Sequence, residues 1–86
     1  MLELIKGYIS NLSINDVDEF AKNNDIYLNN NELAFVYSFI KKNYEAILIN
    51  PDMDLSKYKK MFKQENYDKI ISLLNYYRKK YAKFLP

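Results

Sequence analysis

The stretch Asn29–Leu48, NNNELAFVYSFIKKNYEAIL, decides the fold. Its apolar residues recur at steps of three and four, which places them on one face of a helix. These residues are Leu33, Val36, Tyr37, Ile40, Tyr44, Ile47 and Leu48. Phe35 and Phe39 widen this face, so the helix is apolar over more than half its circumference. We therefore expect a central, buried helix over about 31–48 that contacts partners on two sides.

Both ends of this helix have recognisable signals. Asn29 or Asn30 can cap its start, and Glu32 stands three residues after Asn29, the spacing of a capping box. Pro51 ends the helix, because proline disfavours helical geometry in the residue before it. The remaining polar positions are expected to face solvent: Glu32, Ser38, Lys41, Lys42, Asn43 and Glu45.

Two short helices are predicted before the central one, over about 2–11 and 14–23. Ser13 is a suitable N-cap for the second, since hydroxyl side chains accept hydrogen bonds from the first turn. Asn23 or Asn24 is expected to end it in the left-handed conformation. Its buried side is expected to contain Ile14, Val17, Phe20 and Ala21.

The segment Ile26-Tyr27-Leu28 is too short for a helix and alternates like an extended strand. We expect Ile26 and Leu28 to point inward. The Asn-rich residues 29–31 then turn the chain into the central helix.

Two helices are predicted after Pro51. A short one, capped by Asp54, covers about 55–62, and a long one covers about 65–83. The short helix is expected to bury Leu55, Tyr58, Met61 and Phe62. The long helix is expected to bury Tyr67, Ile70, Ile71, Leu74, Tyr77 and Tyr81. The sequence therefore predicts an all-α single domain, 1–86, of four to five helices, with the last helix antiparallel to the central one.

The composition agrees with this fold class. A chain of 86 residues makes one domain, and a hydrophobic fraction of 49 % argues against disorder. The single Gly argues against a hairpin-rich β fold, because tight hairpin turns need Gly.

The chain contains neither Cys nor His, so disulfides, thiolate metal sites and the commonest general base are excluded. No nucleophilic Ser motif or phosphate-binding Gly-rich loop occurs. The alternation from Asn50 to Ser56 resembles a calcium loop, but its sixth and twelfth positions hold Leu55 and Met61 instead of Gly and Glu. We therefore expect no enzyme activity, no catalytic residue, no cofactor and no metal.

The start of the chain lacks the pattern of a signal peptide, and no apolar run approaches the roughly 18 residues that cross a bilayer. Together with the absence of Cys, this predicts a cytoplasmic protein without membrane contact.

Charge is distributed unevenly along the chain. Residues 1–56 hold four lysines against nine acids, a net charge of −5, whereas residues 57–86 hold nine basic residues against two acids, a net charge of +7. Lysines of the basic half could neutralise phosphates while its tyrosines stack on bases, although most of these tyrosines lie at core spacing. The alternative function is therefore nucleic-acid binding through Lys57, Lys59, Lys60, Lys63, Arg78, Lys79, Lys80 and Lys83.

Aromatic residues make up 16 % of the chain, and several lie beside the core faces of the two longest helices. Uncovered, they would form an apolar patch of the kind that marks protein interfaces. In the alternative arrangement, the first helix covers the aromatic residues on one flank of the core and the short helix covers those on the other, so that no patch is exposed. The leading hypothesis is a non-enzymatic protein-interaction module, and a homodimer is one form that it could take. Its interface would be made by Phe35, Phe39, Leu73, Tyr76 and Tyr77.

Residues 13–48 resemble the helix–extension–helix layout of SAP and Rho N-terminal-like modules, which bind nucleic acid. The matching elements are SINDVDEFAK, then NNDIYL, then the helix from Asn31. Those modules are basic and this segment is acidic, so the resemblance implies the layout without the function.

The pattern L-S-I-N-D-V-x-x-F-A-K-x-N-x-I-x-L, followed by E-L-x-x-V-Y-x-F-I-K-K-N, covers roughly half of the chain. It is similar to a family of small helical proteins of unknown function from low-GC Gram-positive bacteria. This resemblance implies a cytosolic bacterial protein and no particular function.

Overall fold

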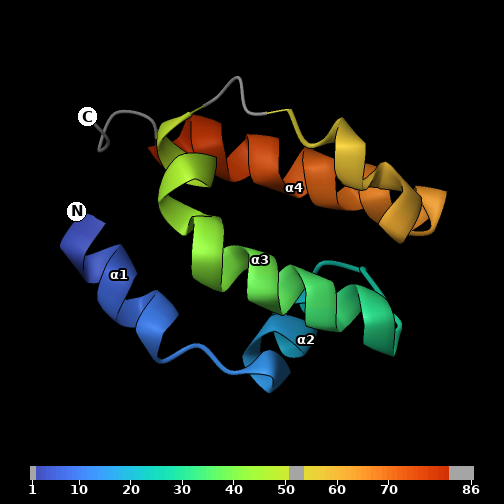
Figure 1. The fold of residues 1–86 in the computed structure, drawn as a ribbon, viewed down its shortest axis with the longest axis horizontal. Helices are drawn as coiled ribbons and strands as arrows, with labels where there is room; N and C mark the ends of the chain where they lie inside the picture. Colours follow the sequence, from blue (N-terminus) through green and yellow to red (C-terminus); the bar gives the residue numbers. More distant parts are fainter. Residues whose placement is uncertain (1, 51–53, 82–86) are drawn as a thin grey trace.

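The computed structural model describes residues 2–50 and 54–81. Within these ranges the chain forms five helices and no β-strand. They are α1 (Leu2–Ser10), α2 (Ile14–Asn23), α3 (Asn30–Ile49), the 3-10 helix η1 (Ser56–Met61) and α4 (Gln64–Tyr81). Figure 1 shows α3 in the middle, with α1 and α2 on one side and η1 and α4 on the other. The all-α fold and the central place of α3 are therefore confirmed.

α3 begins with the predicted capping box. The Asn29 side chain accepts a hydrogen bond of 2.8 Å from the Glu32 N–H, and the Glu32 carboxylate accepts one of 2.9 Å from the Asn29 N–H. These bonds satisfy two backbone donors that the start of a helix would leave without partners. The helix ends at Ile49 with Asn50 as its C-cap, while Pro51 lies outside the described residues.

α2 also begins with a capping box. Ser13 Oγ accepts from the Asp16 N–H at 3.1 Å, and the Asp16 carboxylate accepts from the Ser13 N–H at 2.9 Å. Val17 and Ala21 are buried as predicted. The burial of Ile14 and Phe20 was predicted wrongly, because α2 packs mainly against α3 and leaves these two side chains 39 % and 46 % exposed.

The turn after α2 differs from the prediction at one residue. Asp25, with φ of 60°, adopts the left-handed conformation, whereas Asn24 has φ of −110°. The assignment of this conformation to Asn23 or Asn24 is therefore wrong, although Asp tolerates it for the same reason as Asn. After the turn, the Ile26 N–H donates a hydrogen bond to the Ala21 carbonyl oxygen, with 2.8 Å between nitrogen and oxygen. Ile26 is consequently buried, as predicted.

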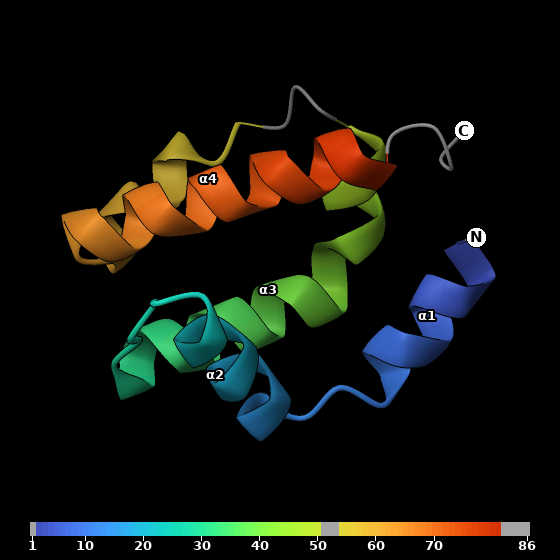
Figure 2. The same ribbon diagram turned by 180° about the vertical axis from the view of Figure 1, so that it is seen from behind.

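α4 runs parallel to α3, so the predicted antiparallel arrangement is wrong. Near the starts of both helices Asn66 hydrogen-bonds Glu32, and near their ends Arg78 hydrogen-bonds the Ile47 carbonyl oxygen. η1 lies beside the first half of α3, so the chain returns to the start of α3 before α4 begins (Figure 2). A short connection directly after α3 would have produced antiparallel neighbours.

The apolar core is small, and all of its buried residues except Leu12 also line the cavity between α3 and α4. Its buried apolar residues, among those described, are Leu12, Val17, Ala21, Ile26 and Ile47. Val36 and Ile40, in the middle of α3, are only half-buried. Both line a cavity on the side of α3 that faces α4.

Candidate functional site

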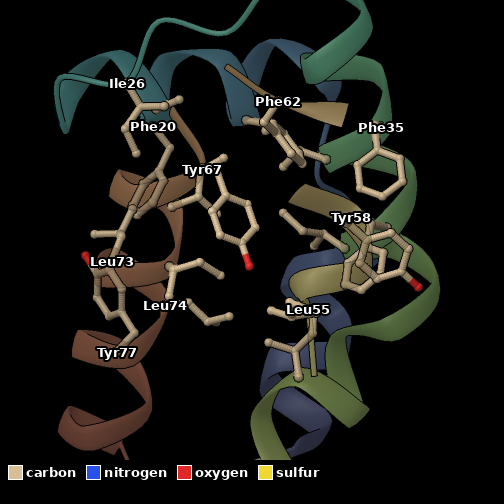
Figure 3. Close-up of a pocket in the computed structure, with 18 residues that line it drawn as sticks. Phe20, Ile26, Phe35, Leu55, Tyr58, Phe62, Tyr67, Leu73, Leu74 and Tyr77 are labelled. Atoms are coloured by element: carbon tan, nitrogen blue, oxygen red, sulfur yellow. The ribbon is translucent and has the colours of Figure 1, made fainter. Parts of the chain in front are cut away.

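A cavity of about 240 Å³ lies between α3 and α4 and is partly open to solvent. Eighteen side chains line it, from α2, α3, α4 and the segments that include Ile26, Leu55 and η1. All of them are aliphatic or aromatic, and the only polar atoms among them are the hydroxyls of three tyrosines. Figure 3 shows two walls, with α4 on one side and α3 with η1 on the other.

Glu32 holds the two walls together at the starts of the helices. Its Oε2 accepts a hydrogen bond of 2.8 Å from the Lys63 N–H, and its Oε1 accepts one of 3.0 Å from the Asn66 side-chain amide. The carboxylate thus lies at the N-termini of both α3 and α4, where the helix dipoles favour a negative charge. Glu32 is 1 % exposed, so its predicted position in solvent is wrong. The first turn of α4 covers it.

Arg78 joins the walls at the opposite end. Its Nε donates a hydrogen bond of 2.9 Å to the Ile47 carbonyl oxygen in the last turn of α3. A cation is favourable there because the C-terminus of a helix bears partial negative charge. Partial burial lowers the pKa of Arg78 from its ordinary value. Polar contacts therefore join α3 and α4 at both ends, and the cavity lies between these contacts.

The size of the cavity has an energetic consequence. At about 24 cal/mol per Å³, an enclosed dry cavity of 240 Å³ would cost about 6 kcal/mol, and this cavity costs less because it is partly open to solvent. Whole domains are stable by only about 5–15 kcal/mol. Water stabilises such a space poorly, because an ordered water needs two to four polar partners. Filling the cavity with apolar atoms would therefore stabilise this fold substantially.

Two of the predicted interface residues pack inside the molecule. The Phe35 ring lies 5.3 Å from Tyr58 and 5.6 Å from Phe62, and the Phe39 ring lies 5.0 Å from Tyr58, between ring centroids. These distances are typical of favourable aromatic pairs. Both phenylalanines are half-buried. η1 thus covers this flank of α3, which is one of the two arrangements expected from the sequence.

The other three predicted interface residues lie together on α4. Tyr76 and Tyr77 are 5.1 Å apart between ring centroids, and Figure 3 shows Leu73 and Tyr77 beside Phe20 of α2. The Phe20 ring centroid is 6.0 Å from that of Tyr77. Phe20 is 46 % exposed and Tyr76 is 56 % exposed. We call these four residues, Phe20, Leu73, Tyr76 and Tyr77, the aromatic edge.

Sequence reasoning placed Phe20 in the core and so missed it as a surface residue. The available signal was its position at the margin of the stripe formed by Val17 and Ala21, directly after the acidic Glu19. Phe20 also lines the cavity, so the aromatic edge is the place where the cavity wall reaches the surface.

The basic residues predicted as nucleic-acid contacts fall into two groups. Lys57, Lys59, Lys60 and Lys63 lie on or next to η1, whereas Lys79 and Lys80 lie at the far end of α4. Lys63 and Lys79 are 16 positions apart, which corresponds to about 24 Å along a helix. Arg78 is engaged with Ile47, and Lys83 lies outside the described residues. The structure does not bring these residues together on one surface.

In the described ranges, 2–50 and 54–81, no three acidic side chains are grouped so that they could hold a metal ion. None of the helices in those ranges has the length and apolar character needed to span a membrane.

Comparison with known proteins supplies no relative. No protein-family model matches this chain, and neither the curated proteins nor the solved structures contain a significant match to it. The two resemblances drawn from the sequence therefore stay predictions.

Proposed function

We propose that this chain is a non-enzymatic protein-interaction module of the cytoplasm that self-associates through the aromatic edge. The observation that supports this most is the grouping of Phe20, Tyr76 and Tyr77 at the surface. Single exposed apolar residues are ordinary, but a contiguous group is typical of a protein interface. Tyrosine suits such a surface because its ring is apolar while its hydroxyl tolerates a wet rim.

The charges on either side of the aromatic edge favour a second copy as the partner. The outer side of α2 carries Asp16 and Glu19, and the last turn of α4 carries Lys79 and Lys80. Asp18 pairs with Lys22, and Arg78 is bonded to Ile47, within the same molecule. Most small homo-oligomers are two-fold symmetric, and their interface is self-complementary. A two-fold axis through the aromatic edge would place α2 of one copy opposite α4 of the other. The acidic side of α2 would then face the basic end of α4 at two symmetric places in the dimer.

Sedimentation equilibrium at micromolar concentrations tests the proposal. Wild-type protein is expected to sediment as a dimer and Tyr76→Glu as a monomer, because the variant places a charge in the apolar contact. Tyr8→Glu is the matched control, since Tyr8 is also exposed, at 67 %, but lies on α1. Phe39→Glu is less suitable, because Phe39 packs against Tyr58 inside the molecule. A monomeric wild type, or equal effects of the two tyrosine variants, would refute self-association through this edge.

The distribution of the basic residues does not favour the nucleic-acid alternative. A tracking surface for a nucleic-acid backbone needs a continuous line of cations. Here Lys63 and Lys79 lie at opposite ends of α4, and Arg78 is bonded to α3.

A further inference from the structure

The cavity between α3 and α4 has the size of a small-molecule site. Its volume is about 240 Å³. An apolar cavity of about 150 Å³ in another protein binds benzene, so this cavity can hold roughly ten non-hydrogen atoms by proportion. It therefore admits a molecule with one substituted ring, or an alkyl chain of similar volume.

The lining restricts the chemistry of an occupant. Ala21 from α2, Val36 and Ile40 from α3, and Ile70 and Leu74 from α4 present only hydrocarbon to the cavity. A charged or strongly polar molecule would lose its hydration there without receiving hydrogen bonds in return. The occupant must therefore be uncharged and mainly apolar.

Tyr67 adds one polar group to this lining. Figure 3 shows its hydroxyl directed into the space between the two walls, whereas the hydroxyls of Tyr58 and Tyr77 are directed away from it. No described residue forms a hydrogen bond with the Tyr67 hydroxyl. The hydroxyl is not fully buried, and a ligand in the cavity can offer it a hydrogen-bond partner in place of water.

We propose that the cavity is a binding site for a small uncharged aromatic molecule with one hydrogen-bonding substituent, such as a substituted phenol, oriented by the Tyr67 hydroxyl. The ligand enters beside Phe20, the lining residue that is itself 46 % exposed. Phe20, Leu73 and Tyr77 of the aromatic edge also line the cavity, so a second copy bound at that edge would border the entrance. Ligand binding is therefore measured at protein concentrations below and above the one at which sedimentation shows the dimer to form.

The test uses two probes that differ by one hydroxyl, 4-ethylphenol and ethylbenzene. Each is titrated into wild-type protein while backbone amide shifts and the melting temperature are recorded. Both probes are expected to raise the melting temperature and to shift the amides of Val36, Ile40, Ile70 and Leu74, which line the cavity. No response to either probe at millimolar concentration, or shifts confined to exposed residues such as Tyr76, would overturn the proposal.

Two variants test the role of the hydroxyl and the location of the site. In Tyr67→Phe the affinity for 4-ethylphenol relative to ethylbenzene is expected to fall about fivefold, the effect of one neutral hydrogen bond. Tyr76→Phe, a matched change outside the lining, is expected to leave this ratio unchanged. Leu74→Trp fills the cavity and is expected to abolish binding of both probes while circular dichroism stays helical. An unchanged ratio in Tyr67→Phe, or a folded Leu74→Trp variant that binds as the wild type does, would overturn the assignment.

Discussion

The side-chain amide of Asn66 donates a hydrogen bond of 3.0 Å to the carboxylate of Glu32, and both side chains are almost completely buried. The same amide donates a second bond of 3.0 Å to the Tyr27 carbonyl oxygen. The amide therefore joins α4 to Tyr27, just before α3, and to Glu32, in the first turn of α3, two residues that lie more than 30 positions away in the chain. This contact requires the start of α4 to lie beside the start of α3, so it specifies their parallel arrangement.

The variant Asn66→Ala is expected to lower the free energy of unfolding by about 2–3 kcal/mol, because it leaves buried acceptors of Glu32 and Tyr27 without this donor. Urea denaturation followed by circular dichroism measures the change. Asn75→Ala is the matched control, since Asn75 is an exposed residue of the same helix and Ala favours helix formation. Similar losses in the two variants would contradict a special role of the buried amide.

At the other end of the helices, Arg78→Met is expected to destabilise the fold by about 1–2 kcal/mol. The variant keeps most of the apolar stem but removes the bond to the Ile47 carbonyl oxygen and the cation at the C-terminus of α3. Lys79→Met removes the charge of an exposed neighbour and serves as the control. A smaller loss in Arg78→Met than in Lys79→Met would show that the contact with Ile47 is not stabilising.

Asp16 makes the stability of the fold depend on pH, and the direction of this dependence follows from the pKa of its carboxyl group. Hydrogen bonds from the Ser13 backbone and side chain lower the pKa of Asp16 below its ordinary value of 3.8. The folded state thus favours the ionised carboxylate, so its stabilising contribution is complete above the unfolded pKa and is lost as the pH falls through the lower, folded pKa. In thermal melts at several pH values, Asp16→Asn is expected to melt below wild type at pH 6. This difference should disappear as the pH falls well below 3.8. A difference that is independent of pH would show that the charge of Asp16 does not matter.

Much of this fold is local information and could be predicted from the sequence. The three- and four-residue spacing of apolar residues predicted both ends of α3 to within two residues. The Asn29–Glu32 spacing predicted its capping box. Ser13 was likewise identified as the N-cap of α2, and the structure confirms it. Such features depend on residues within one helical turn, where geometry leaves few alternatives.

The direction of α4 could not be predicted in this way. Periodicity identifies the apolar face of each helix but is the same for parallel and antiparallel neighbours. The direction of α4 depends on Glu32, which caps α3 and also binds the start of α4. Only the first of these roles can be recognised from neighbouring residues in the sequence. Its spacing from Asn29 indicates a helix cap, whereas its bonds to Lys63 and Asn66 join residues more than 30 positions apart in the chain.

The candidate site was predicted only in part. Leu73, Tyr76 and Tyr77 were identified as a group because they lie within five residues on one helix. Phe20 joins them through tertiary packing, which the sequence of α2 does not show. The cavity has no sequence signal, because apolar spacing shows which side chains face inward and not whether they reach one another across the gap.

Charge exchange across the proposed dimer is the sharpest test of its geometry. Glu19→Lys or Lys79→Glu alone is expected to weaken self-association about threefold to tenfold, because each places like charges opposite each other in two symmetric contacts. The double variant Glu19→Lys/Lys79→Glu should restore most of the affinity, since opposite charges again face each other between the copies. Lys57→Glu, the same reversal on η1 away from the aromatic edge, is the control. If the double variant associates no better than either single one, α2 and α4 do not meet across the interface, and a two-fold axis through the aromatic edge is excluded.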